Sequence, residues 1–161
     1  MNRKFLLTAV VAGFIGFVAG NAFWYLASPL WIDQVVNETL PDASTATTVA
    51  RGRFKGADAV HKGSGQAMIL RAASGTHTLR FTDFKSTNGP DLEVWLVKAR
   101  DIKSASDVTS SKWISLGRLK GNIGNQNYTL PANVDPADYG SVVIWCEQFG
   151  VLFSSATLSG T

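Results

Sequence analysis

The chain has 161 residues, a net charge of +3 at neutral pH and one cysteine. Hydrophobic residues make up 45% of it and charged residues 17%, a balance that excludes a largely disordered chain. The small positive excess is scattered, with no run of more than two Lys or Arg, so we expect no nucleic-acid partner. A single thiol also excludes an internal disulfide.

The first 27 residues predict a membrane anchor. Arg3 and Lys4 precede an apolar run over residues 5–26. At 1.5 Å per residue such a run spans about 30 Å, the thickness of the hydrocarbon core of a bilayer. The positive residues before the run place the N-terminus in the cytoplasm. We therefore expect a single pass through the cytoplasmic (inner) membrane, with the C-terminal domain in the periplasm or outside the cell. A cleaved signal peptide is the alternative.

Residues 28–49 are expected to form a juxtamembrane helix and a stalk. Ser28 and Pro29 suit the first positions of a helix, and residues 37–50 are mostly small and polar, as in a linker.

The membrane segment before them carries small residues at a spacing of four: Ala12, Gly16 and Gly20. This spacing permits a homodimer through the anchor, although small residues are common in all membrane helices.

Residues 50–161 are predicted to be all-β, a β-sandwich of short antiparallel strands. Short alternating runs separated by Gly, Asn, Asp and Pro carry this prediction. The expected strands are Gln66–Ala73, Thr76–Phe81, Asp91–Lys98, Lys112–Gly117, Gln126–Leu130, Ser141–Cys146 and Val151–Leu158. Ser74 and Gly75 between the first two indicate a hairpin. No later segment keeps a helical period, apart from one short turn expected at residues 135–139.

The strand that ends at Cys146 is apolar on both faces, which predicts a central position in a sheet. Side chains alternate along a strand, so Cys146 should share a face with Val142 and Ile144. Trp145 should share the opposite face with Val143.

Short motifs follow one another in a fixed order along the domain: Gly52-Arg53-Phe54, Gly56-Ala57-Asp58, Leu79-Arg80-Phe81, Asp83-Phe84, Asn88-Gly89-Pro90-Asp91-Leu92, Leu116–Gly121, Gly124–Tyr128 and Val142–Cys146. This order resembles the DM-thirteen domain family, an electron-transfer domain found beside DOMON domains in Skeletor-like extracellular proteins. The family also occurs alone in bacteria behind a membrane anchor. The resemblance covers about residues 50 to 160. It implies a β-rich extracytoplasmic module whose signature cysteine, Cys146 here, is a redox centre or a haem-associated ligand.

Cys146 is the first candidate for redox or ligand chemistry, and a buried structural cysteine is the alternative. One-electron chemistry at a lone thiol calls for a cofactor, and haem is the one considered. His61 or His77 would then be the second axial ligand. The chain has no Cys-x-x-Cys-His motif, which excludes covalent c-type haem. For each histidine the alternative is an ordinary hydrogen-bonding role.

Asp83, Asn88 and Asp91 gather oxygen atoms between two predicted strands and are the candidate ligands of a hard cation such as calcium. Turn chemistry of the Asn-Gly-Pro sequence is the alternative. No Gly-x-Ser-x-Gly or His-Glu-x-x-His motif is present, so we expect no catalytic turnover of its own.

Together these features predict an accessory domain in electron transfer, working through Cys146 with a redox partner protein. The alternative is a non-catalytic module that binds a protein, a carbohydrate or a cation.

Overall fold

The computed structural model describes residues 2–28, 31–40 and 45–160. The elements are α1 (Arg3–Ala27), β1 (Val35–Asn37), β2 (Thr47–Arg53), β3 (Lys55–Gly56), β4 (Gly63–Arg71), β5 (His77–Ser86), β6 (Leu92–Val97), α2 (Ala105–Thr109), β7 (Trp113–Arg118), β8 (Ile123–Thr129), the 3₁₀ turn η2 (Pro136–Asp138), β9 (Ser141–Cys146), β10 (Val151–Thr157) and β11 (Ser159–Gly160). The chain divides into two compact units, Met1–Ile32 and Asp33–Thr161.

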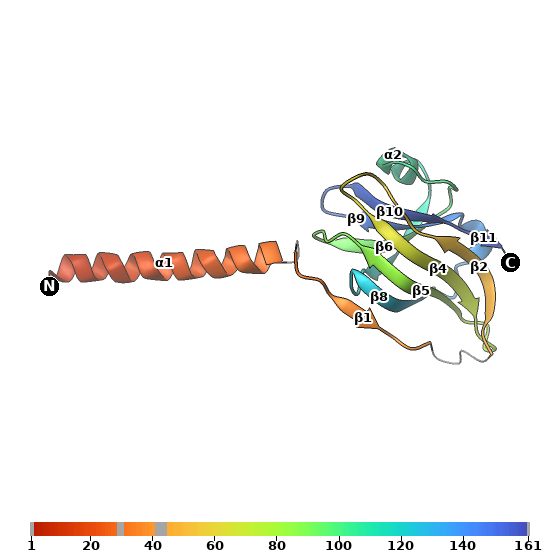
Figure 1. The fold of residues 1–161 in the computed structure, drawn as a ribbon, viewed down its shortest axis with the longest axis horizontal. Coiled ribbons are helices and arrows are strands. Elements are labelled where there is room, and N and C mark those ends of the chain that lie inside the picture. The colour runs from red at the N-terminus through yellow and green to blue at the C-terminus, as the bar shows by residue number, and fades with distance from the viewer. Residues whose placement is uncertain (1, 29–30, 41–44, 161) are drawn as a thin grey trace. The chain divides into compact units, whose positions relative to one another are not determined.

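The first unit is the helix α1, drawn in red and orange in Figure 1. The side chain of Asn2 caps its start by accepting a hydrogen bond from the backbone N–H of Lys4. Its large apolar side chains are exposed, as a lipid-facing helix requires; Phe17, for example, is 69% exposed. By length and composition α1 suits a membrane span, and a signal sequence near an N-terminus has the same properties. The homodimer expected through Gly16 and Gly20 stays a prediction.

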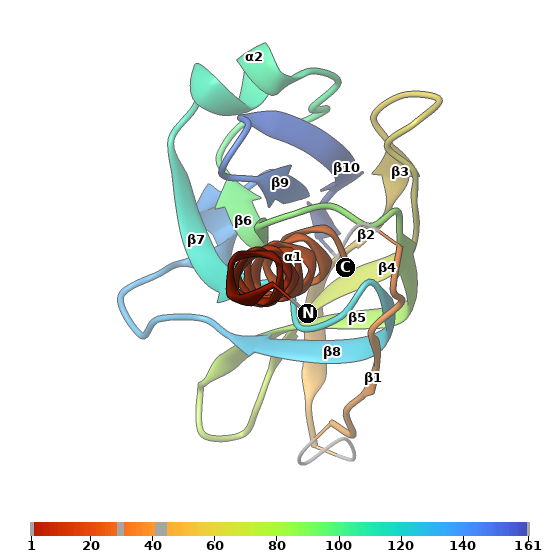
Figure 2. The ribbon, with the colours of Figure 1, turned by 90° about the vertical axis from the view of Figure 1, so that its left-hand side faces the viewer.

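The second unit is built from two sheets, and Figure 2 shows β4, β5 and β8 in one layer with β6, β9 and β10 in the other. One sheet has six strands in the order β1-β8-β5-β4-β2-β11, and the other has five in the order β3-β10-β9-β6-β7. All neighbouring strands are antiparallel except β1, which runs parallel to β8. The predicted β-sandwich is confirmed.

The main core lies between the sheets and is rich in aromatic rings. Phe81 is fully buried, and its ring packs against Phe54, Phe84 and Tyr128 at centroid distances of 4.9, 4.9 and 5.4 Å. Buried aliphatic residues from both sheets complete this core: Ile69, Leu79, Val94, Leu96, Val142 and Ile144. Burial of this apolar surface supplies the main driving force for the fold.

A second core covers the outer face of the five-stranded sheet, beneath α2. Val108 of α2 is fully buried there against Trp95, Val143 and Trp145. Cys146, by contrast, belongs to the main core with Val142 and Ile144. The predicted alternation along β9 is therefore confirmed, as is its central position between β10 and β6.

Two parts of the domain differ from the expectation. The helix α2 lies in a region for which no helix was predicted, because five residues are too few to show a helical period. Residues 28–49 were expected as helix and stalk, yet residues 35–37 form β1, which pairs with Ile123 to Asn125. The compact unit accordingly begins at Asp33 and not near residue 50. Pro29, expected at the start of that helix, lies outside the described residues.

Candidate functional site

Cys146 ends β9 and faces the core between the sheets. Its side chain is 1% exposed, and its thiol donates a hydrogen bond to the carbonyl oxygen of Pro90, with 3.0 Å between Sγ and oxygen. The strands on either side pair Cys146 with Leu92 and Val151. The thiol is therefore closed off from solvent, and the segment just before β6, which contains Pro90, forms part of its cover.

His61 lies at the same end of the sandwich. Its ring packs on Phe153, with 4.4 Å between ring centroids, and Phe153 packs tightly against Gly89, the residue before Pro90. Nδ1 of His61 lies 2.7 Å from Oδ2 of Asp58, and this hydrogen bond lowers the pKa of Asp58 to about 2.

His77 lies at the opposite end of the six-stranded sheet. It is the first residue of β5, whereas Ser86 at the far end of β5 pairs with Gly63, two residues beyond His61. Nine steps along a strand at about 3.3 Å each separate the two ends by roughly 30 Å. The two histidines therefore cannot serve one site, and only His61 is near Cys146.

A haem does not fit between Cys146 and a histidine in this conformation. An axial ligand must present its sulfur or nitrogen to an open space that admits the porphyrin. Here Sγ is buried and bonded to Pro90, and the ring of Phe153 lies against both His61 and Gly89.

Two of the three candidate ligands of a hard cation have partners of their own. Asp91 accepts a hydrogen bond from the guanidinium of Arg118 at 2.7 Å, and the amide of Asn88 donates to Asp33 at 3.3 Å. The side chain of Asp83 is exposed at an irregular point of β5. Within the described part of the chain, no three His, Cys, Asp or Glu side chains are grouped so as to hold a metal ion. Among the described residues, no contact shared by the three candidates supports the cation site, which stays a prediction.

The sequence reading missed a tryptophan cluster on the outer face of the five-stranded sheet. The rings of Trp95 and Trp113 are stacked, with 3.7 Å between centroids and 9° between planes, and Trp145 lies 5.3 Å from Trp95. The indole N–H of Trp95 donates to Oε2 of Glu93 at 2.7 Å. The spacing of these residues along the chain carries no signal, because their contact depends on the pairing of β6 with β7 and β9.

The carboxylates beside this cluster influence each other. Burial tends to raise the pKa of Glu93, but hydrogen bonds from Trp95 and Ser115 outweigh it, so the net shift is downward. The negative charge of Glu93 raises the pKa of the neighbouring Glu147. Glu93 is therefore the carboxylate that keeps its charge, and Glu147 is the one that takes up a proton more readily.

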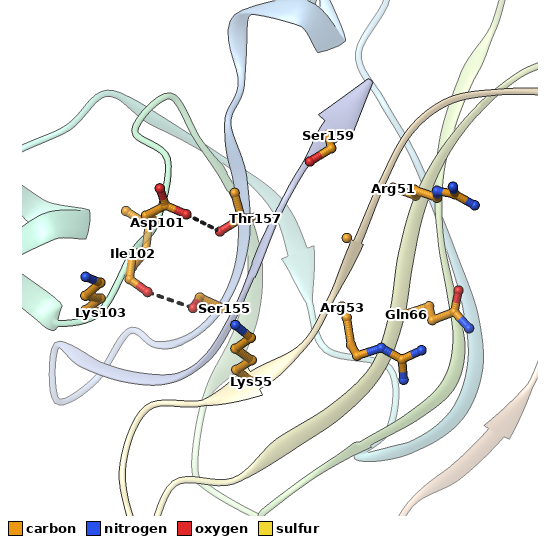
Figure 3. Close-up of a pocket in the computed structure, with 11 residues that line it drawn as sticks. Arg51, Arg53, Lys55, Gln66, Asp101, Ile102, Lys103, Ser155, Thr157 and Ser159 are labelled. Atoms are coloured by element: carbon orange, nitrogen blue, oxygen red, sulfur yellow. Dashed lines mark hydrogen bonds between the residues drawn. The ribbon is translucent and has the colours of Figure 1, made fainter. Parts of the chain in front are cut away.

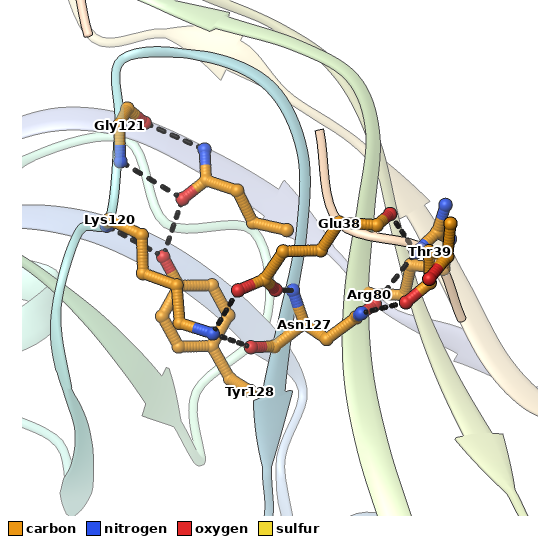
Figure 4. Close-up of polar contacts among 8 residues, drawn as sticks. Glu38, Thr39, Arg80, Lys120, Gly121, Asn127 and Tyr128 are labelled. Atoms are coloured by element: carbon orange, nitrogen blue, oxygen red, sulfur yellow. Dashed lines mark hydrogen bonds and ion pairs between the residues drawn. The ribbon is translucent and has the colours of Figure 1, made fainter. Parts of the chain in front are cut away.

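A buried polar network joins the loop after β7 to β8 (Figure 4). Gln126 is fully buried; its Nε2 donates to the carbonyl of Gly121 at 2.6 Å. Its Oε1 accepts from the Gly121 N–H at 3.3 Å and from the Tyr128 hydroxyl at 2.7 Å. Burial is the main reason that the pKa of Tyr128 lies well above its usual value, so the phenol remains a neutral donor.

Glu38 connects the segment after β1 to this network. Oε1 accepts from Nζ of Lys120 at 2.8 Å, and Oε2 accepts from the N–H of Asn127 at 2.7 Å. Arg80 also donates to the Glu38 carbonyl oxygen at 3.2 Å. The hydrogen bond from Lys120 is the largest cause that lowers the pKa of Glu38, and burial opposes it. These contacts hold the chain before residue 40 on the sheet.

Replacing Glu38 with glutamine is expected to lower the free energy of unfolding at pH 7 by less than about 1 kcal/mol, the usual range for a partly exposed ion pair. The folded-state pKa lies below the ordinary 4.5, so the carboxylate stabilises the fold above that value. This contribution disappears as the pH falls through the folded pKa. Urea midpoints of variant and native chain should therefore differ at pH 7 and converge toward pH 3.

Glu147→Gln is the matched control, because the pKa of Glu147 is shifted in the opposite direction. It should not lower the midpoint at pH 7. A gap between Glu38→Gln and the native chain that stays constant from pH 7 to pH 3 would contradict the assignment.

The fold and these contacts define a class of protein: a two-sheet β domain, preceded by an apolar helix, with one buried cysteine at the end of a central strand. The model of the family described as Electron transfer DM13 matches residues 53–158, and the chain belongs to that family. No curated protein and no solved structure matched the chain. The resemblance noted in the sequence is confirmed.

Proposed function

We propose that this chain is a single-pass membrane protein whose β domain assists electron transfer outside the cytoplasmic membrane, with Cys146 as its redox group. The observation that carries the proposal is the family match over residues 53–158, which includes the one thiol of the chain. The apolar helix α1 and the positive residues before its apolar run support the location. We expect the partner to be a redox protein that presents an accessible site to this domain.

The chemistry of a lone thiol sets what such a partner must supply. The thiolate of Cys146 can attack a disulfide of the partner and form a mixed disulfide, and the second partner sulfur then leaves as a thiolate. No second cysteine of this chain can resolve that bond, so a thiolate of another molecule must attack it and release the thiolate of Cys146. Sγ must also become accessible, which requires the segment around Pro90 to move away and release its hydrogen bond.

Reaction of the full chain with an aromatic disulfide reagent, in a non-ionic detergent, tests this proposal. We expect Cys146 to react under native conditions, at a rate that hardly changes with low concentrations of urea, because only a local opening is needed. Pro90→Gly should loosen the cover and raise this rate several-fold. Cys146→Ser gives the background rate.

Reaction that occurs only at the rate of global unfolding, in the native chain and in Pro90→Gly alike, would overturn the redox role. The thiol would then be a buried structural group.

A second candidate is a non-catalytic module that binds a protein, a carbohydrate or a cation. The closed environment of Cys146 favours it, and so does a hollow of about 990 Å³ formed by residues 74–77 and 129–137. His77 and Arg71 line this hollow, at the end of the sheet away from His61. Such a module would need no reaction at the thiol.

A further inference from the structure

A cationic hollow of about 630 Å³ lies where the edges of the two sheets meet (Figure 3). The six-stranded sheet contributes β2 and β11, and the five-stranded sheet contributes β3 and β10. Residues 101–103, in the loop that precedes α2, complete the lining. Neither Cys146 nor a histidine lines this hollow.

Positive charge dominates the lining. Arg51, Arg53, Lys55 and Lys103 contribute four cationic side chains, whereas Asp101 contributes the one carboxylate of the lining. Within the described residues, no salt bridge involves any of the four cations, although Lys103 lies within electrostatic reach of Asp107. A concave surface with a net positive charge concentrates anions from solution.

Close packing forms the floor and one wall of the hollow. A Cβ atom at Gly52 would collide with the carbonyl oxygen of Thr157, so glycine lets β2 approach β10 closely. On the other side, the hydroxyl of Ser155 donates to the Ile102 carbonyl oxygen at 2.8 Å. The hydroxyl of Thr157 donates to the carboxylate of Asp101 at 3.1 Å and supplies one of the hydrogen-bond donors that this carboxylate needs. The loop before α2 is thereby fixed against β10.

The cations lie on both sides of the strands at this edge and do not converge on one point. Figure 3 shows Arg51, Arg53 and Gln66 reaching out from one side of the strands, and Lys55 standing beside Ser155. Such a distribution suits several negative charges spread over one ligand better than a single carboxylate. Guanidinium groups pair with phosphate and sulfate oxygens through two parallel hydrogen bonds, and lysine contributes a point charge.

We propose that this hollow binds an oxoanion with two or more negative charges, of the phosphate or sulfate class. The ligand chemistry is the same whether a solute or the headgroup of a phospholipid supplies it. The inference is independent of the role of Cys146, because it rests on residues that line a different part of the domain. Arg51, Gly52 and Ser159 also lie outside the residues that match the family.

Calorimetric titration of inorganic pyrophosphate into the full chain, held in nanodiscs of zwitterionic phosphatidylcholine at low ionic strength, tests the site. We expect saturable binding that weakens as salt is added. The double variant Arg51→Gln/Arg53→Gln should bind at least tenfold more weakly, and Lys55→Gln alone at least threefold. All three side chains are exposed, so the fold should be retained, with unchanged urea midpoints.

Lys85→Gln/Lys112→Gln is the matched control, because it removes the same charge from exposed positions outside the hollow. It should change the affinity less than twofold. Absence of saturable binding would overturn the proposal, and so would an equal loss in the control and the arginine double variant.

A second titration distinguishes the two sources of the ligand. Dihexanoyl phosphatidic acid, whose phosphate monoester carries up to two negative charges, is used below its micelle concentration as a competitor of pyrophosphate. If the lipid competes at lower concentrations than inorganic phosphate does, the lipid headgroup is the source. Competition no better than that of inorganic phosphate identifies a phosphate-bearing solute. Both outcomes support the oxoanion site and differ only in what fills it.

Discussion

Phe81→Ala is expected to lower the free energy of unfolding by about 3–5 kcal/mol, the usual cost of removing a buried phenyl ring. Phe81 is fully buried in the middle of β5, and its ring contacts Phe54, Phe84 and Tyr128. Phe54 precedes β3, Phe84 lies in β5 and Tyr128 lies in β8. These neighbours are therefore held by different segments and cannot all move inward to fill the space. A loss of this size approaches the whole stability of an ordinary domain. Urea unfolding of the full chain in a non-ionic detergent, followed by tryptophan fluorescence, measures the change.

Phe149→Ala provides the matched control, because the side chain removed is the same and Phe149 is 64% exposed. Its free energy of unfolding should lie within about 0.5 kcal/mol of the native value. If Phe81→Ala costs no more than this control, the aromatic cluster is not the centre of the core.

Gln126→Leu is expected to cost about 3 kcal/mol or more, although leucine has a similar size and is more hydrophobic. The substitution leaves the N–H and carbonyl of Gly121 and the hydroxyl of Tyr128 without their partner in a buried place. Each unpaired buried polar group costs about 1–3 kcal/mol. The same urea titration measures this change.

Tyr128→Phe removes the hydroxyl, which donates to Gln126 and also accepts from the Lys120 N–H, and is expected to cost about 1–2 kcal/mol. In the double variant Gln126→Leu/Tyr128→Phe the loss should be smaller than the sum of the two single losses, since the hydroxyl that leucine strands is then absent. Additive losses would show that the two side chains do not act as a pair.

Local patterns predicted those parts of the fold that depend on neighbouring residues in the chain. Alternation along residues 141–146 placed Cys146 on one face with Val142 and Ile144 and Trp145 on the other with Val143, and this division is confirmed. The hairpin at Ser74 and Gly75 is confirmed as well, with Gly75 at a φ of 88° that favours glycine.

The features that the sequence did not predict depend on long-range contacts. The three residues of β1 carry no strand signal of their own and are fixed by pairing with β8, almost ninety residues further along the chain. The helix α2 had one local signal, Asp107 three residues after Ser104, where the carboxylate accepts the Ser104 N–H. The burial of Cys146 followed from its strand, but its bond to Pro90 required the fold of the loop before β6.

The same dependence on long-range contacts explains why the candidate site residues lie apart in the structure. His61 and His77 are sixteen residues apart in the sequence, yet β4 and β5 carry them to opposite ends of a sheet. Lys103 is about fifty residues from Arg51 and Lys55 in the chain, and the fold brings all three to one hollow.

The pairing of β1 with β8 has a consequence for how the domain resists self-association. An uncovered outer strand offers free N–H and carbonyl groups to a neighbouring molecule and so promotes aggregation. Residues 35–37 occupy that position on β8, and Glu38 holds the chain there through Lys120 and Asn127. A soluble fragment that begins near residue 45 would bare this strand, whereas one that begins before Asp33 would keep it covered.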